Sequence, residues 1–151
     1  METLDLEKKY IEERVRILRT LQDCFGDKVI EIAAEAKKKL MGPRICEKYK
    51  KDLPVDIQRF FEIIFVDFEG IDRIIDFKVV KKSKKELEVK INRCWYAKTY
   101  RALEAADIGE KLVCDMDPEM NKALNPKIRM ERPKKLMCGD NCCIFRYRLE
   151  E

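Results

Sequence analysis

The chain has 151 residues, of which 41% are charged and 46% hydrophobic, with 33 basic and 29 acidic side chains. This length suits one compact domain with a real core, so we expect a single domain over residues 1–151. The surplus of four positive charges is spread through the chain and not gathered in a tail, which argues against a dedicated nucleic-acid binder.

The sequence also indicates where in the cell the protein is expected. No apolar run is long enough to span a membrane, and the first residues lack a signal-peptide pattern. Seven cysteines without a small-loop framework suit a reducing compartment in which thiols stay free or bind something. We therefore expect a soluble cytoplasmic protein that has neither a membrane nor a nucleic acid as its partner.

The first half, residues 1–70, is predicted to be mainly helical. Apolar side chains recur at helical spacing over residues 4–21 and again over 29–41, where Gly42-Pro43 should end the second helix. After Pro54, apolar side chains are too dense for a surface helix, which predicts a buried core helix. The run from Phe60 to Phe65 could also exceed what one small core covers, and this excess would favour a homodimer.

The second half, residues 71–151, is predicted to hold a hairpin, short helices and a second hairpin. Apolar and polar residues alternate over 75–79 and 87–91, and again over 128–132 and 143–147. Short helices are expected over 95–103 and 107–114, and a third is expected to begin at Pro118 and end before Asn125, with Asp107 and Asp117 as caps. We predict an α+β domain: N-terminal helices packed on a four-stranded antiparallel sheet made of two hairpins separated by short helices.

Cysteines dominate the candidate chemistry, because the chain has no histidine. Cys94, Cys114 and Cys143 fall at the ends of predicted elements, where they could line one pocket. Three thiolates with a water would make a zinc or iron site with an open position. The same thiols could instead contact or attack a substrate, or could simply be buried apolar side chains. The other four cysteines are given no role.

Carboxylates are the candidate general bases. Asp115 and Asp117 follow Cys114 directly, and a carboxyl group shielded from water has its pKa raised toward neutrality. A helix cap remains the alternative for Asp117, and an ordinary turn residue is the alternative for Asp140. Arg93 and Lys135 are candidate cations that could lower the pKa of a neighbouring thiol.

Several separated motifs carry a family resemblance. They are Cys94, Cys114-Asp115-Met116-Asp117, Leu124-Asn125-Pro126-Lys127-Ile128 and Gly139-Asp140-x-x-Cys143-x-Phe145-Arg146. Through these motifs the C-terminal third, from Cys94 to Arg148, resembles the L-2-amino-thiazoline-4-carboxylic acid hydrolase family. The closing hairpin is also similar to vinyl-reductase-type domains, which are small-ligand-binding units of helices and a curved antiparallel sheet.

The hydrolase resemblance implies opening of a small cyclic amidine ring that bears a carboxylate. It would assign Asp117 or Asp115 as the base, Cys143 to catalysis, and Cys94, Cys114 and Cys143 as zinc or iron ligands or pocket thiols. Binding of the substrate would fall to Arg93, Arg146 and Asp140, with an arginine holding its carboxylate. The competing hypothesis is a non-enzymatic module that senses a small molecule or a metal.

Overall fold

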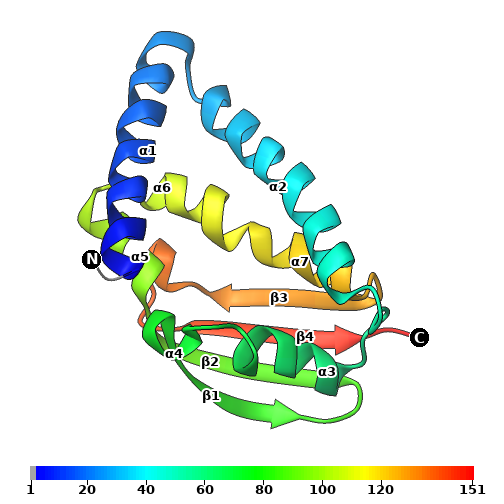
Figure 1. The fold of residues 1–151 in the computed structure, drawn as a ribbon. Coiled ribbons are helices and arrows are strands. Elements are labelled where there is room, and N and C mark those ends of the chain that lie inside the picture. Colours follow the sequence, from blue (N-terminus) through cyan, green and yellow to red (C-terminus); the bar gives the residue numbers. More distant parts are fainter. Residues whose placement is uncertain (1–2) are drawn as a thin grey trace.

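The computed structural model describes residues 3–151 and shows helices lying over one side of an open antiparallel sheet (Figure 1). The strand order is β1-β2-β4-β3, which confirms the predicted α+β fold with a four-stranded sheet. Within residues 3–151, no helix is both long and apolar enough to cross a membrane. The elements are α1 (Thr3–Phe25), α2 (Lys28–Tyr49), α3 (Ile57–Phe61), the π-helical η1 (Glu62–Val66), α4 (Ile71–Ile74), β1 (Ile75–Lys82), β2 (Glu86–Cys94), α5 (Trp95–Ala102), α6 (Ala106–Gly109), the π-helical η2 (Glu110–Cys114), α7 (Met116–Leu124), β3 (Ile128–Lys134), the 3-10 turn η3 (Leu136–Cys138) and β4 (Cys143–Leu149).

The sheet joins the two predicted hairpins through its central strands. β1 pairs with β2 and β3 pairs with β4, as expected, and β2 then pairs with β4 in antiparallel register. On β2, Leu87, Val89 and Ile91 are buried because alternate residues of a strand face the same side. The polar residues between them face away from the helices. The helices therefore cover the apolar face of the sheet and leave the other face to water.

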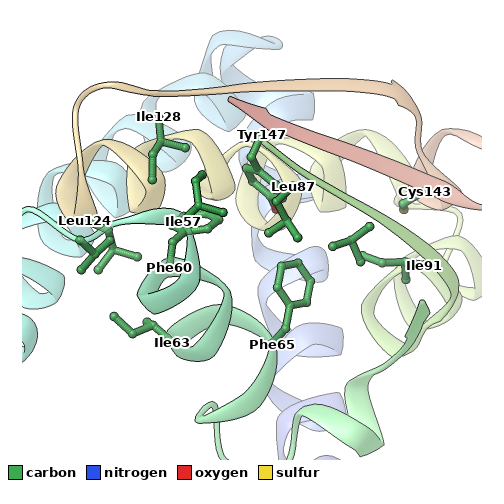
Figure 2. Close-up of a cluster of buried hydrophobic side chains, with 12 residues drawn as sticks. Ile57, Phe60, Ile63, Phe65, Leu87, Ile91, Leu124, Ile128, Cys143 and Tyr147 are labelled. Atoms are coloured by element: carbon green, nitrogen blue, oxygen red, sulfur yellow. The ribbon is translucent and has the colours of Figure 1, made fainter. Parts of the chain in front are cut away.

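The main core lies between this face and the helix after Pro54, as Figure 2 shows. Phe60 is fully buried, and its ring packs edge-on against Tyr147 with centroids 4.8 Å apart. Phe65 is also buried and packs near Tyr147 and Phe77. The predicted core helix is thus confirmed. Within the run from Phe60 to Phe65, Phe60, Ile63 and Phe65 are buried in the core of one chain, and Phe61 and Ile64 remain partly exposed. The homodimer stays a prediction.

A second core cluster joins α1 and the first half of α2 to the short helices α5 and α6. Its centre is crowded at Gly109, where an added Cβ would lie 2.7 Å from both Met137 Sδ and Tyr100 Cγ. Real Cβ atoms do not approach other heavy atoms so closely. The thioether of Met137 can move, but the Cγ atom of fully buried Tyr100 cannot shift without moving the ring.

Gly109→Ala is expected to lower the free energy of unfolding by about 1–3 kcal/mol through overpacking. Gly42→Ala is the matched control, since Gly42 is also helical but a Cβ there meets nothing within 4 Å. The control should be neutral or slightly stabilising, because alanine favours the helix over glycine by about 1 kcal/mol. Urea unfolding of both variants measures the difference, and equal stabilities would contradict the crowding at Gly109.

Two local predictions are wrong. The second helix does not end at Gly42-Pro43 but continues to Tyr49. Proline removes only one backbone hydrogen bond, whereas Ile45 and Tyr49 beyond it pack against the main core and hold the last turns in place. Asp107 does not cap α6, because its carboxylate instead pairs with Arg19 at 2.7 Å.

Candidate functional site

A cavity of about 230 Å³ lies between the apolar face of the sheet and the helices that cover it. Its lining comes from η1, α4, α5, η2, α7 and η3, from the end of α2, and from all strands except β3. Most of the lining side chains are aliphatic or aromatic, among them Ile91, Phe145 and Met120. This cavity is our candidate functional site.

Cys94, Cys114 and Cys143 all line this cavity. Cys94 is the last residue of β2, and Cys143 opens β4 directly across from Ile91 of β2, three residues before Cys94. Cys114 ends η2, which packs against α7 and α2 over the same cavity. The fold thus brings together three thiols that lie twenty and twenty-nine residues apart in the sequence.

The thiols are neutral pocket groups in this setting. Burial raises the pKa of Cys143 to about 11, raises the pKa of Cys94, and raises that of Cys114 further still. The backbone N–H of Leu136 donates to Cys143 Sγ at 3.2 Å but does not offset the burial. Within residues 3–151, no three side chains of histidine, cysteine, aspartate or glutamate are grouped so that they could hold a metal ion.

The raised thiol pKa values predict selective alkylation. At pH 8, iodoacetamide should modify exposed Cys24 and Cys46 quickly, Cys94 more slowly, and Cys114 and Cys143 at least about 100-fold more slowly, because the thiolate is the reactive form. Peptide mapping by mass spectrometry measures each rate. Alkylation after unfolding in urea is the control and should equalise the five rates. Rapid labelling of Cys114 in the folded protein would contradict the neutral thiols.

Asp117 is the acidic group of the cavity lining. It lies in the first turn of α7, is half-buried, and is one of the residues that line the cavity. Burial raises the pKa of Asp117 to about 7, Asp115 raises it as well, and Arg132 and Lys37 act to lower it. The predicted cap role is wrong, because Asp115 holds the N-cap position, without a side-chain hydrogen bond.

Lys37 and Arg132 are the two cations whose charges act on Asp117. The sequence did not predict them as site residues. Lys37 Nζ donates to the Leu112 carbonyl, and Arg132 Nη1 donates to the Cys114 carbonyl. Burial lowers the pKa of Lys37. One signal was available: position 37 falls on the same helical face as buried Ile30 and Ala34, where a lysine is unusual.

The two predicted carboxylate clamps lie outside the cavity lining. Arg93 pairs with Asp76 at 2.9 Å, and Arg146 pairs with Glu88 at 3.1 Å, with both guanidinium groups substantially exposed. Among the residues that line the cavity, Lys48 is the one lysine or arginine. Its side chain is exposed to solvent, which places this cation at the rim of the cavity.

The remaining predicted residues also have partners outside the cavity. The Asp140 carboxylate accepts a hydrogen bond from the Lys135 backbone N–H at 2.8 Å, as a turn residue does. The Lys135 ammonium group pairs with Glu110. Asp115 pairs with Arg132 at 3.4 Å and does not line the cavity. Of the predicted site residues, the fold therefore gathers Asp117 and the three thiols.

Known proteins and families show what this chain is similar to. No curated protein matches the chain. A crystal structure of a trafficking protein particle complex subunit 3 from Naegleria fowleri, covalently bound to palmitic acid, has the same fold at a TM-score of 0.56 and 14% identity, covering 99% of this chain and 98% of that one. The profile of the L-2-amino-thiazoline-4-carboxylic acid hydrolase family matches residues 6–147, far more than the C-terminal third. The chain therefore belongs to the L-2-amino-thiazoline-4-carboxylic acid hydrolase family.

Proposed function

We propose that this protein binds a small molecule with a long apolar body, of the fatty-acyl type, in the cavity. The observation that carries this proposal is the composition of the lining, which is mostly aliphatic, aromatic and neutral thiol groups around about 230 Å³. Moving a hydrocarbon chain from water into such a space is favourable by about 25 cal/mol per Å² of apolar surface buried. A polar substrate would lose its hydration there without enough partners to replace it.

Two charged side chains, Lys48 and Asp117, would orient the ligand in the cavity. Lys48 lies at the rim and can pair with a carboxylate that stays near water. Asp117 lies within the protein and carries a negative charge above about pH 7, which repels a carboxylate. The hydrocarbon tail would therefore enter first, toward the thiols. The palmitic acid held by the trafficking-complex subunit of the same fold supports a ligand of this kind.

Calorimetric titration with straight-chain carboxylic acids of increasing length tests the proposal. Affinity should rise with chain length until the cavity is full, and Cys114→Trp, which puts a ring into the cavity, should abolish binding. Lys48→Glu should weaken binding of the acids at least several-fold but not that of the matching alcohols, whereas exposed Lys51→Glu should change neither. Absence of saturable binding, or undiminished binding to Cys114→Trp, would refute the proposal.

Hydrolysis of a thiazoline carboxylic acid is a second candidate function, and Asp117 favours it. A carboxyl group with a pKa of about 7 can take a proton from an attacking water near neutral pH. Lys48 would have to hold the substrate carboxylate, since Arg93 and Arg146 lie away from the cavity. Incubation with L-2-amino-thiazoline-4-carboxylic acid tests this candidate. Turnover that Asp117→Asn abolishes would support it, and no turnover by the wild type would refute it.

A further inference from the structure

One face of α7 brings polar side chains to a cavity whose lining is mostly apolar. Asp117, Met120 and Asn121 all line the cavity, and their spacing of three and four residues places them on one side of the helix. Met120 is apolar like most of the lining, whereas Asp117 and Asn121 carry oxygen atoms. Side chains four residues apart on a helix have Cβ atoms about 5–6 Å apart. One small polar group in the cavity could therefore contact both.

Asn121 is buried but incompletely hydrogen-bonded. It is 2% exposed, and its Nδ2 donates to Met130 Sδ at 3.2 Å, although a thioether is a weak acceptor. Within residues 3–151, no group donates to its carbonyl oxygen Oδ1. This oxygen is not sealed off, because Tyr100 Oη is the one fully occluded side-chain nitrogen or oxygen without a partner in that range. Buried polar groups nearly always have partners, so an accessible, unpaired oxygen beside a cavity points to a ligand.

The polar face of α7 lies away from the rim of the cavity. Helices α2 and α7 run side by side in the same direction (Figure 1), and Cys46 Sγ of α2 donates to the Ala123 carbonyl of α7 at 3.6 Å. At a rise of about 1.5 Å per residue, Asp117 lies about 9 Å before Ala123, and Lys48 lies about 3 Å beyond Cys46. About 12 Å along the helices therefore separates Asp117 from the lysine at the rim, and Asn121 lies between them. A ligand whose carboxylate pairs with Lys48 would bring the distal part of its chain to these groups.

We propose that the ligand of the cavity carries a hydroxyl group on the distal part of its apolar body, bound between Asn121 and Asp117. This inference rests on the proposed binding of a fatty-acyl-type molecule. A hydroxyl group donates one hydrogen bond and accepts others, so it can donate to Asn121 Oδ1 or to the Asp117 carboxyl group. The charges of Lys37 and Arg132 also act on Asp117, and these cations disfavour an ammonium group there. The surroundings therefore select a neutral donor.

Calorimetric titration compares decanoic acid with two relatives that carry one hydroxyl group, either on the last carbon or next to the carboxylate. The wild type should bind the acid with the distal hydroxyl roughly five-fold more tightly than decanoic acid, because this group completes hydrogen bonds that the protein leaves open. A hydroxyl next to the carboxylate stays near the rim and should change affinity less than about two-fold. Equal or weaker binding of the distal hydroxy acid would overturn this inference alone. No binding of any of these acids would overturn it together with the proposed function.

A substitution on α7 tests the part played by Asn121. Asn121→Leu removes the polar atoms at similar side-chain size, and the distal hydroxyl should then weaken binding several-fold, because it loses its water partners in an apolar space. Met120→Leu is the matched control, since Met120 lines the same side of the cavity with an apolar side chain, and it should keep the preference for the distal hydroxy acid. The ratio of the two affinities is taken within each variant, so a general change of cavity shape cancels. An Asn121→Leu protein that still prefers the distal hydroxy acid would overturn the role of Asn121.

Discussion

Asp117→Asn is expected to stabilise the protein by roughly 2–4 kcal/mol at pH 8 and by little at pH 4. The physical reason is the partial burial of Asp117, which removes water from the carboxyl group and raises its pKa to about 7 from an ordinary value of 3.8. A raised pKa means that the folded state holds this proton more tightly than the unfolded state. Each unit of difference between the folded and unfolded pKa corresponds to about 1.4 kcal/mol. Because Asp117 is still partly exposed, the expected stabilisation is smaller than the whole pKa difference would give.

The pH window follows from the two pKa values. Below about pH 4 the group is protonated in both states, and its contribution to stability is fully present. Between pH 4 and 7 the unfolded state releases the proton first, so folding stability falls as pH rises through the folded pKa. Asparagine resembles the neutral carboxyl group at every pH and should remove this part of the pH dependence.

Urea unfolding at pH 4, 6 and 8 measures the effect, with Asp115→Asn as the control. Asp115 lies outside the cavity lining, and its charge is a smaller cause of the raised pKa of Asp117 than burial is, so its substitution should leave most of the decline between pH 4 and 7 in place. An Asp117→Asn protein that loses stability with pH as steeply as the wild type would show that Asp117 is ionised normally.

Phe60→Ala is expected to lower the free energy of unfolding by about 3–5 kcal/mol. Phe60 is fully buried between the helix and the sheet, and its ring packs edge-on against Tyr147. Removing it leaves a void that the sheet cannot close, because β2 and β4 are fixed by their ladder hydrogen bonds.

Guanidinium unfolding measures this loss. Phe68→Ala is the matched control, because Phe68 is 50% exposed and its truncation should cost less than about 1 kcal/mol. Similar losses at the two positions would mean that the core between α3 and the sheet is not packed as the structure shows.

Most of the fold could be predicted from the sequence, because the spacing of apolar residues differs between helices and strands. The alternation Leu87, Val89, Ile91 marks a strand with one buried face, and the dense apolar run after Pro54 marks the core helix. Local rules failed where tertiary contacts decided the outcome. The helix passes through Pro43 because Ile45 and Tyr49 pack on the core beyond it.

The site was harder to predict than the fold. The positions of Cys94, Cys114 and Cys143 at element ends suggested a shared pocket, and the strand order that brings them together is a property of the whole sheet. Asp117 before Pro118 has the pattern of a helix cap, so only tertiary structure reveals that it faces a cavity. Arg93 and Arg146 suit a carboxylate by residue type, but each meets an acidic residue on a neighbouring strand.

Intermolecular nuclear Overhauser effects with a carbon-13-labelled straight-chain acid test the binding cavity most directly. We predict contacts from the ligand methylene groups to Ile91, Phe145 and Met120, which line the cavity. Cys114→Trp should remove these contacts. Contacts confined to exposed Ile17 and Leu21 of α1, or none at all, would contradict an apolar ligand inside the fold.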